Sequence, residues 1–412
     1  MTKTIRNIFS RKHLLISIFF IIVLIIAYLF VDYWGPGKIP LRNDIAFGFP
    51  CLRASDLIVQ EYDKNGNLWA TRGMIVYQLK KGDNKFTKIT HVPTGLSVFW
   101  LRNFSILRRL SLRPECVEMT ITDNGNLYAL SAGKIWLLSA NEKKFKESLK
   151  LSNYGFGDQG IRNDGIININ DSTVFVGEYF RNPNKEKVQI FESRSKMGTW
   201  ENVYEFPPGR IRHIHAIQKD PYSGKLWICT GDLDEESLVA WSDDEFKTIQ
   251  NIGYGSQIWR VCQLIFTEKN VLWGTDTASE KEAGIYSWDR NTGEVQKYQG
   301  IDGAIFFGTK LKNGTMVMSS DREGFKNEKD DKTRLYVISK DFNITSLECG
   351  TWDHKKPGFW FKYAMLRFQR DQGGPSLVIT CLNQKEFPES ELIIISEDSL
   401  ISITKNVSAS PK

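Results

Sequence analysis

The sequence predicts an all-β protein, a β-propeller with seven four-stranded blades, preceded by one N-terminal transmembrane helix. Three observations predict it. An uninterrupted apolar run of 18 residues lies near the N-terminus, a turn phrase recurs seven times at intervals of 44 to 60 residues, and apolar runs of strand length flank each turn. A repeat of this length without a convincing helical pattern is typical of propellers, in which each repeat forms one blade.

The apolar run, Leu14–Val31, predicts a membrane anchor. At about 1.5 Å per residue it extends for about 27 Å, close to the hydrocarbon thickness of a bilayer. Basic residues precede the run and aromatic residues follow it, so we expect the N-terminus in the cytoplasm and the rest of the chain outside. A cleaved signal peptide is the alternative, but no small-x-small cleavage site follows the run. The flanking residues are Lys3, Arg6, Arg11 and Lys12 before it, and Tyr33 and Trp34 after it.

These features divide the chain into five expected parts. They are a basic cytoplasmic tail (1–12), a transmembrane signal anchor (13–34), a Gly- and Pro-containing stalk (35–50), the propeller (51–405) and a C-terminal tail (406–412). The chain has 412 residues, 41% of them apolar, and a net charge of +6. Since 48 acidic residues are interleaved with the basic ones, we expect no nucleic-acid partner.

Seven turn markers divide the propeller, and each repeat reads in the same order. An apolar run leads into the turn, a second run leaves it, a third apolar run follows, and a fourth, more polar run ends the repeat. Phe246–Ile252 and Ser399–Thr404 are examples of the fourth run. The markers are Asp63, Asp123, Asp171, Asp220, Glu268, Lys312 and Asp371. Six blades are the alternative, because the first copy is weak and residues 91–115 interrupt the pattern; a solenoid is disfavoured because no polar capping repeat is present.

Six cysteines are present, and none forms a CxxC pair, so a zinc-ribbon or thioredoxin-like site has no support. Cys229, Cys262 and Cys381 lie in apolar strand patterns and are expected in the core. Cys51, Cys116 and Cys349 lie nearer loops, where an oxidising compartment allows two of them to pair; the sequence leaves the pairing open.

The segment Ser193–Trp200, "SRSKMGTW", resembles the Asp box of sialidase-like propellers, the turn Ser-x-Asp-x-Gly-x-x-Trp. Ser195 stands where the Asp is usual, and one residue is inserted before the Gly. Later repeats keep a Ser and an acid at this place, as in "SDDEFKTI" and "SWDRNTGEV". The resemblance covers residues 56–404 and implies the propeller fold. An Asp box is a folding element, so the resemblance implies no activity by itself.

One face of the propeller is the expected working surface. In each blade, the innermost strand begins on the same face of the propeller on which the second strand ends. We expect basic and acidic residues to lie together on this face, over blades three to six. The link between turn marker and third strand is 11 residues in the first two repeats and 16 to 22 in the other five. The basic candidates are Arg162, Arg212, His213, His215 and Arg260, and the acidic ones are Glu178, Asp232, Asp276 and Asp321.

Three arginines at equivalent positions suit a carboxylate, sulfate or phosphate group, because a guanidinium group pairs with planar anions. The ordinary alternative is that they pair with the neighbouring acids. The sialidase resemblance implies a Tyr nucleophile with an acidic partner and a separate acid. Tyr179 beside Glu178, with Asp232, Asp276 and Asp321, are the catalytic candidates, although no spacing singles them out.

The metal-binding patterns are weak, and we expect no cofactor. Asp232, Asp234 and Glu235 lie in an acidic loop with oxygen ligands suited to Ca²⁺, but the spacing of an EF-hand loop is missing, so a solvated loop is favoured. His213 and His215 alternate as in a strand and lie on one side of it. Without a clear third ligand, we expect them to be hydrogen-bonded polar groups.

The favoured function is a membrane-anchored, extracytoplasmic propeller that binds an anionic surface or extracellular glycan without catalysis. The alternatives are a sialidase-like glycoside hydrolase or lyase acting on an acidic sugar, and a scaffold for protein partners in the cell envelope. The sequence leaves open whether the protein is an enzyme.

Overall fold

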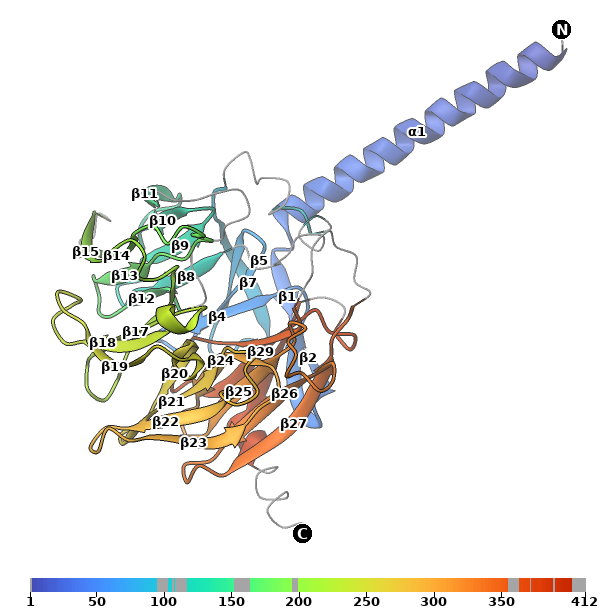
Figure 1. The fold of residues 1–412 in the computed structure, drawn as a ribbon. Helices are drawn as coiled ribbons and strands as arrows, with labels where there is room; N and C mark the ends of the chain where they lie inside the picture. Colours follow the sequence, from blue (N-terminus) through green and yellow to red (C-terminus); the bar gives the residue numbers. More distant parts are fainter. Residues whose placement is uncertain are drawn as a thin grey trace.

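The computed structural model of the chain describes residues 2–94, 103–105, 107, 117–151, 164–194, 199–354, 363–370, 372–387 and 390–401. Strands form seven sheets arranged as blades around a central axis, and a long helix projects from one side (Figure 1). The innermost strands of successive blades contact one another around the whole ring, and the last contacts the first. The predicted seven-bladed propeller is confirmed, and the six-bladed alternative is wrong.

Blades 1 to 3 follow the predicted order, with the innermost strand first in each four-stranded repeat. Blade 1 consists of β4 (Ile58–Tyr62), β5 (Leu68–Arg72), β6 (Ile75–Leu79) and β7 (Lys85–His91), and β1 (Lys38–Pro40) adds a fifth strand outside β7. Blade 2 consists of β8 (Glu118–Ile121), β9 (Leu127–Ser131), β10 (Lys134–Leu138) and β11 (Lys146–Lys150). Blade 3 consists of β12 (Ile166–Asn168), β13 (Val174–Gly177), β14 (Val188–Ser193) and β15 (Trp200–Phe206).

Blades 4 to 6 have the same order, with two short 3-10 helices in the connecting loops. Blade 4 consists of β16 (Ile214–Lys219), β17 (Leu226–Thr230), β18 (Leu238–Ser242) and β19 (Gln250–Tyr254), with η2 (Asp234–Glu236) after β17. Blade 5 consists of β20 (Val261–Phe266), β21 (Asn270–Thr275), β22 (Gly284–Asp289) and β23 (Val295–Gly300), preceded by η3 (Gln257–Trp259). Blade 6 consists of β24 (Ala304–Lys310), β25 (Met316–Asp321), β26 (Lys332–Ile338) and β27 (Ile344–Thr351).

Blade 7 closes the ring with strands from both ends of the propeller. Its strands are β28 (Met365–Phe368), β29 (Ser376–Leu382), β30 (Glu391–Ser396), β3 (Phe49–Ala54) and β2 (Arg42–Ala46). In β3, Leu52 pairs with Ile394 of β30. The prediction that Ser399–Thr404 supplies the fourth strand is wrong: residues 397–401 are helical, and β3 fills that place. The range expected to be a stalk thus contains β1 and β2, which pair with blades 1 and 7.

Short polar side chains that accept hydrogen bonds from the backbone hold the recurring turns, and in blades 1 and 4 these side chains are acidic. Asp63 Oδ1 accepts hydrogen bonds from the backbone N–H groups of Asn65 and Asn67, and its Oδ2 accepts one from the Trp69 ring. In the turn between the third and fourth strands of blade 4, Asp244 accepts bonds from the backbone and hydroxyl of Thr248. A short acceptor side chain that bonds backbone N–H groups is the mechanism expected from the turn sequences.

The blades pack through apolar faces, and the cysteines in the described residues belong to this core. Cys51, Cys229, Cys262, Cys349 and Cys381 are all buried, and none of these five described cysteines is in a disulfide bond. Cys51 and Cys349, for which a disulfide was left open, are therefore unpaired thiols, and Cys116 lies outside the described residues.

The N-terminal helix α1 (Thr2–Trp34) contains a segment, Ile16–Trp34, that is long and apolar enough to cross a membrane. A helix of this kind is compatible with a membrane anchor and with a signal sequence. Its C-terminal end contacts blade 1 beside β5 and β7 (Figure 1). Tyr33 packs on the ring of His91 with centroids 4.9 Å apart, and the Lys88 ammonium group bonds the carbonyl of Trp34.

Candidate functional site

Polar side chains from two adjacent blades, 4 and 5, converge on Asp232. The face on which they lie is the one where innermost strands begin and second strands end, here called the site face. The pairing of Ile214 with Thr230 in blade 4 and of Val261 with Thr275 in blade 5 defines it. Asp232 follows the end of β17 on this face.

Gly231 brings the chain close to its neighbours just before Asp232. Its backbone has φ +154°, and a Cβ atom there would lie 3.0 Å from Ser237 Oγ and 3.3 Å from Arg260 Cγ. Glycine thus permits a conformation and a close approach that a side chain would obstruct. Asp232, the next residue, lies where blade 4 meets the beginning of blade 5, with its carboxylate between Arg212 and Arg260.

Each carboxylate oxygen of Asp232 lies between one histidine and one arginine. Oδ2 is 3.2 Å from Arg212 Nη1 and 3.5 Å from His213 Nε2. Oδ1 is 3.5 Å from Arg260 Nη2 and 3.6 Å from His215 Nε2. The structure therefore brings together four of the predicted basic residues around one predicted acid.

Backbone carbonyl groups fix the orientation of both imidazole rings. His213 Nδ1 lies 3.1 Å from the carbonyl oxygen of Phe180, and His215 Nδ1 lies 3.0 Å from that of Val261. Since a carbonyl oxygen only accepts hydrogen bonds, each Nδ1 is the donor, and each Nε2 faces the cluster. The two Nε2 atoms lie 3.2 Å apart. Tyr179 packs on the His213 ring, with ring centroids 4.2 Å apart.

The charges in the cluster reinforce one another. Burial raises the pKa of the Asp232 carboxyl group, but the interactions with His213 and His215 outweigh burial, and the pKa is lowered. Burial likewise opposes the charge on Arg260, yet the nearby Asp276 and Asp232 raise its pKa. Asp232 is thus an anion, and Arg260 a cation, over the whole physiological range.

A second layer of acidic groups surrounds these residues. Asp276 Oδ2 lies 3.3 Å from Arg260 Nε and accepts a hydrogen bond from the Cys262 thiol, also at 3.3 Å. Glu236 is fully buried and lies 3.7 Å from Arg212 Nη2 and 2.6 Å from Lys185 Nζ. The arginines on either side of Asp232 are therefore each held by a further carboxylate.

The other predicted residues lie apart from Asp232 or outside the described part of the chain. The Glu178 carboxylate accepts a hydrogen bond from the backbone N–H of Gln189 at 2.9 Å, and burial raises its pKa to about 7. The Asp321 carboxylate is buried and accepts bonds from the N–H groups of Phe306 and Leu366. Arg162 lies outside the described residues.

The acidic-loop candidates for calcium do not converge. Asp234 Oδ1 accepts a hydrogen bond from Gln257 Nε2 at 2.8 Å, while Glu235 pairs with Lys185 at 3.0 Å. Among the described residues, the side-chain groups spaced for a metal ion are His213 with His215 and Asp232, and His215 with Cys262 and Asp276. Neither group contains Asp234 or Glu235.

A second charged cluster, which the sequence did not indicate, lies among the innermost strands. Arg367 on β28 makes two bonds to the Glu118 carboxylate of β8, at 2.8 and 2.6 Å. Arg370 lies 2.6 Å from Glu61 Oε2, at the end of β4. Burial raises the pKa of the neighbouring Asp164 to about 7, against the opposing effect of the two arginines. Charged residues within innermost strands are the signal that would have revealed it.

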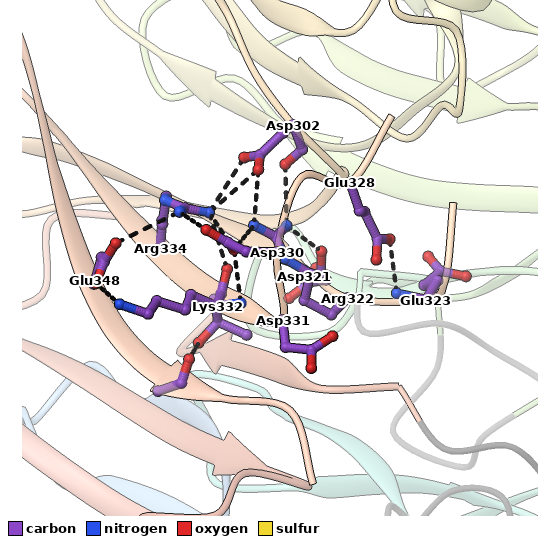
Figure 2. Close-up of polar contacts among 12 residues, drawn as sticks. Asp302, Asp321, Arg322, Glu323, Glu328, Asp330, Asp331, Lys332, Arg334 and Glu348 are labelled. Carbon is purple, nitrogen blue, oxygen red and sulfur yellow. Dashed lines mark hydrogen bonds and ion pairs between the residues drawn. The ribbon is translucent and has the colours of Figure 1, made fainter. Parts of the chain in front are cut away.

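Blade 6 carries a third network of charges beside the site face (Figure 2). Arg334 lies 3.3 Å from the Asp302 carboxylate and also pairs with Asp330. The buried Arg322 lies 3.3 Å from the same Asp302. These contacts tie the start of β24 to the loop before β26, and none of them reaches Asp232.

Comparison with known proteins supports the fold and leaves the family open. No protein-family model matches the sequence, and no curated protein is found to match it. A chain of the crystal structure of the mitotic checkpoint complex is 8% identical with a TM-score of 0.50, over 87% of this chain and 94% of that chain. An identity this low shows the propeller fold alone.

Two other solved structures are similar at lower scores. The extracellular domain of a putative one component system from B. thetaiotaomicron is 11% identical with a TM-score of 0.49, over 86% of this chain and 39% of that chain. A chain of the nidogen/laminin complex is 9% identical with a TM-score of 0.40, over 64% of this chain and 94% of that chain.

Proposed function

We propose that the protein is a membrane-anchored, extracytoplasmic propeller that binds an anionic group of a surface or extracellular glycan at the Asp232 cluster, without catalysis. The observation that carries the proposal is the position of Arg212 and Arg260, which come from adjacent blades and lie on either side of one carboxylate. Their side chains remain 28% and 19% exposed, so both are accessible to a ligand.

Arg212 and Arg260 have N–H donors available for a ligand in addition to their ion pairs with Asp232. Their ion pairs with Asp232 are 3.2 and 3.5 Å long and use single nitrogen atoms rather than a two-bond fork. A guanidinium group carries five N–H donors, so each arginine has donors left for the oxygen atoms of a carboxylate or sulfate. Asp232 then acts as the group that orients both arginines.

Aromatic and apolar side chains lie on the same face. Tyr254 is 62% exposed and Leu233 is 44% exposed. Tyr254 pairs with Leu238, which pairs with Thr230 at the end of β17, so it lies at the site face. The Arg210 guanidinium group lies 5.8 Å from the centroid of the Tyr254 ring. An exposed ring beside cationic groups suits a sugar with an acidic substituent, because the ring packs on the sugar's apolar side.

Binding is favoured over hydrolysis by the placement of the acids. The carboxylates nearest to the arginines, Asp232 and Asp276, are engaged by them, and the Glu178 carboxylate bonds to the backbone of β14. The Tyr–Glu partnership implied by the sialidase resemblance is therefore not supported by the direction of the Glu178 side chain.

The test is glycan binding by the full-length protein in detergent micelles, on an array of neutral and anionic glycans. We expect binding of anionic glycans that weakens at least tenfold in Arg212→Gln and in Arg260→Gln and falls with added salt. Arg334→Gln is the matched control, since Arg334 belongs to the separate network of blade 6 (Figure 2). Binding of neutral and anionic glycans alike, or no binding by folded wild-type protein, would contradict the proposal. Release of a sugar product would replace it with the hydrolase alternative.

A further inference from the structure

We propose that His213 Nε2, His215 Nε2 and the Asp232 carboxylate bind a divalent cation of the zinc type in four-coordinate geometry, with the fourth position open. The inference goes beyond the proposed glycan binding; it shares the Asp232 carboxylate but uses the histidine nitrogens instead of the arginines. It starts from the spacing of the three groups rather than from the arginines around them.

The spacing matches the edges of a coordination tetrahedron. Zinc binds histidine nitrogen and carboxylate oxygen at about 2.0–2.1 Å, which places two ligand atoms of a tetrahedron about 3.3 Å apart. Here the two Nε2 atoms are 3.2 Å apart, and they lie 3.5 and 3.6 Å from the Asp232 oxygens. Each histidine nitrogen faces a different oxygen of the carboxylate, and one ligand atom from each of the three residues lies within 4.8 Å of the other two.

The orientation of the histidines is the one that metal ligands require. Both Nδ1–H groups donate to backbone carbonyl oxygens, those of Phe180 and Val261, so the lone pair of each Nε2 is directed into the cluster. Two lone pairs that face each other at 3.2 Å repel unless a cation lies between them. A proton on one ring would remove the repulsion between the two histidines. A metal ion would remove it as well and would also bind the Asp232 carboxylate.

The charge around the three ligands leaves room for an anion on the metal. Four acids, Asp232, Asp276, Glu235 and Glu236, pair with three cations, Arg212, Arg260 and Lys185. A divalent ion adds two positive charges, and the fourth acid offsets one of them. The fourth position is therefore suited to water, hydroxide or an anionic ligand.

The second possible ligand group, His215 with Cys262 and Asp276, is the weaker one. It reaches His215 through Nδ1, which lies 3.7 Å from Cys262 Sγ but already donates to the carbonyl of Val261. The Cys262 thiol in turn donates to Asp276. Binding there would require the loss of both hydrogen bonds, whereas the Nε2 site requires neither.

The experiment measures zinc bound to the full-length protein in detergent, after treatment with EDTA and without any glycan. We expect one Zn²⁺ per chain by elemental analysis after desalting. Affinity should fall at least about 100-fold in His213→Gln and in His215→Gln, and about 10- to 100-fold in Asp232→Asn. His354→Gln is the matched control, because His354 pairs with Asp331 in blade 6. Circular dichroism and thermal unfolding report whether each variant is folded.

Cobalt supplies a second measurement, because a cluster with only a structural role would not give the spectrum of bound cobalt. Co²⁺ bound to the wild-type protein should give the intense visible bands of a four-coordinate site, lost in His213→Gln and His215→Gln. Three results would each overturn the assignment. Folded wild-type protein could retain no zinc, cobalt could give the weak bands of a six-coordinate site, or Cys262→Ser could lose the metal while Asp232→Asn keeps it. Because no glycan is present, such failure is separate from failure of the proposed binding function.

Discussion

The carboxylate of Asp32, in the last turn of α1, lies 3.2 Å from the guanidinium group of Arg72 at the end of β5. Asp32 also accepts bonds from the backbone and hydroxyl of Ser105. Since second strands end on the site face, this contact fixes the helix to the same face of the ring on which Asp232 lies. The C-terminal end of α1 and the Asp232 cluster thus lie on the same face of the ring.

Asp32→Ala should loosen the junction between helix and propeller. Asp32 is 6% exposed, and its removal leaves the N–H of Ser105 without its acceptor, although Arg72 keeps an ion pair with Asp56 at 2.7 Å. We expect a loss of about 1–3 kcal/mol in the free energy of unfolding, measured by denaturant titration in detergent. Asp44→Ala removes an exposed ion-pair partner of Arg53 and should cause no measurable change. Equal stability of Asp32→Ala and wild type would show that the junction is not held by this contact.

Removal of β3 should prevent ring closure. A chain that starts at residue 57 lacks the strand that pairs with β30, which leaves the edge of blade 7 open. A chain that starts at residue 36 keeps β1, β2 and β3. We expect cooperative unfolding and a monomer for the longer fragment, and aggregation for the shorter one, in size-exclusion chromatography. A monomeric, cooperatively unfolding fragment from residue 57 would disprove the closing role of β3.

Glu118→Ala should be strongly destabilising. Arg367 is 1% exposed and would lose the carboxylate with which it makes two hydrogen bonds of 2.8 and 2.6 Å. Breaking a buried ion pair in this way costs about 3–5 kcal/mol. Glu147→Ala, which removes the exposed partner of Lys134, is the control. The measurement is the midpoint of denaturant unfolding, and similar midpoints for the two variants would argue against a buried pair.

Stability should fall as pH rises through the range set by Asp164. Burial raises the pKa of this carboxyl group from 3.8 to about 7, so the folded protein holds a proton that the unfolded chain has released between these pH values. Unfolding then becomes easier as pH increases from about 4 to about 7, and Asp164→Asn should reduce this slope, while Glu178, whose pKa is also raised to about 7, keeps its own contribution. Asp289→Asn, in an exposed turn where backbone hydrogen bonds lower the pKa, should leave the slope between pH 5 and pH 7 unchanged. Unfolding measured across this pH range tests the slopes, and parallel curves for wild type and Asp164→Asn would contradict the assignment.

The candidate site was predictable in its residues but not in its arrangement. The alternation of side chains in a strand predicted that His213 and His215 lie on the same side of it. The positions of Asp232 and Asp276, at the ends of second strands, predicted that both lie on the site face. The sequence offered no sign that Asp232 reaches both histidines and both arginines, because Gly231 and the loop containing η2 set the position of its carboxylate. The charged pairs of Arg367 and Arg370 escaped prediction for a similar reason, since their partners come from blades at the other end of the chain.

The sequence by itself indicated seven blades, with six as the alternative, because a short local turn recurs with each repeat; Asp63 holds the first of these turns. It also determined the apolar helix, since an uninterrupted apolar run needs no distant contact to form one. Only the tertiary structure decided how the ring closes, with β3 beside β30, and which acids meet which bases. Those contacts join residues that are hundreds of positions apart or in different blades. A short segment of sequence therefore does not indicate which partner its residues will contact.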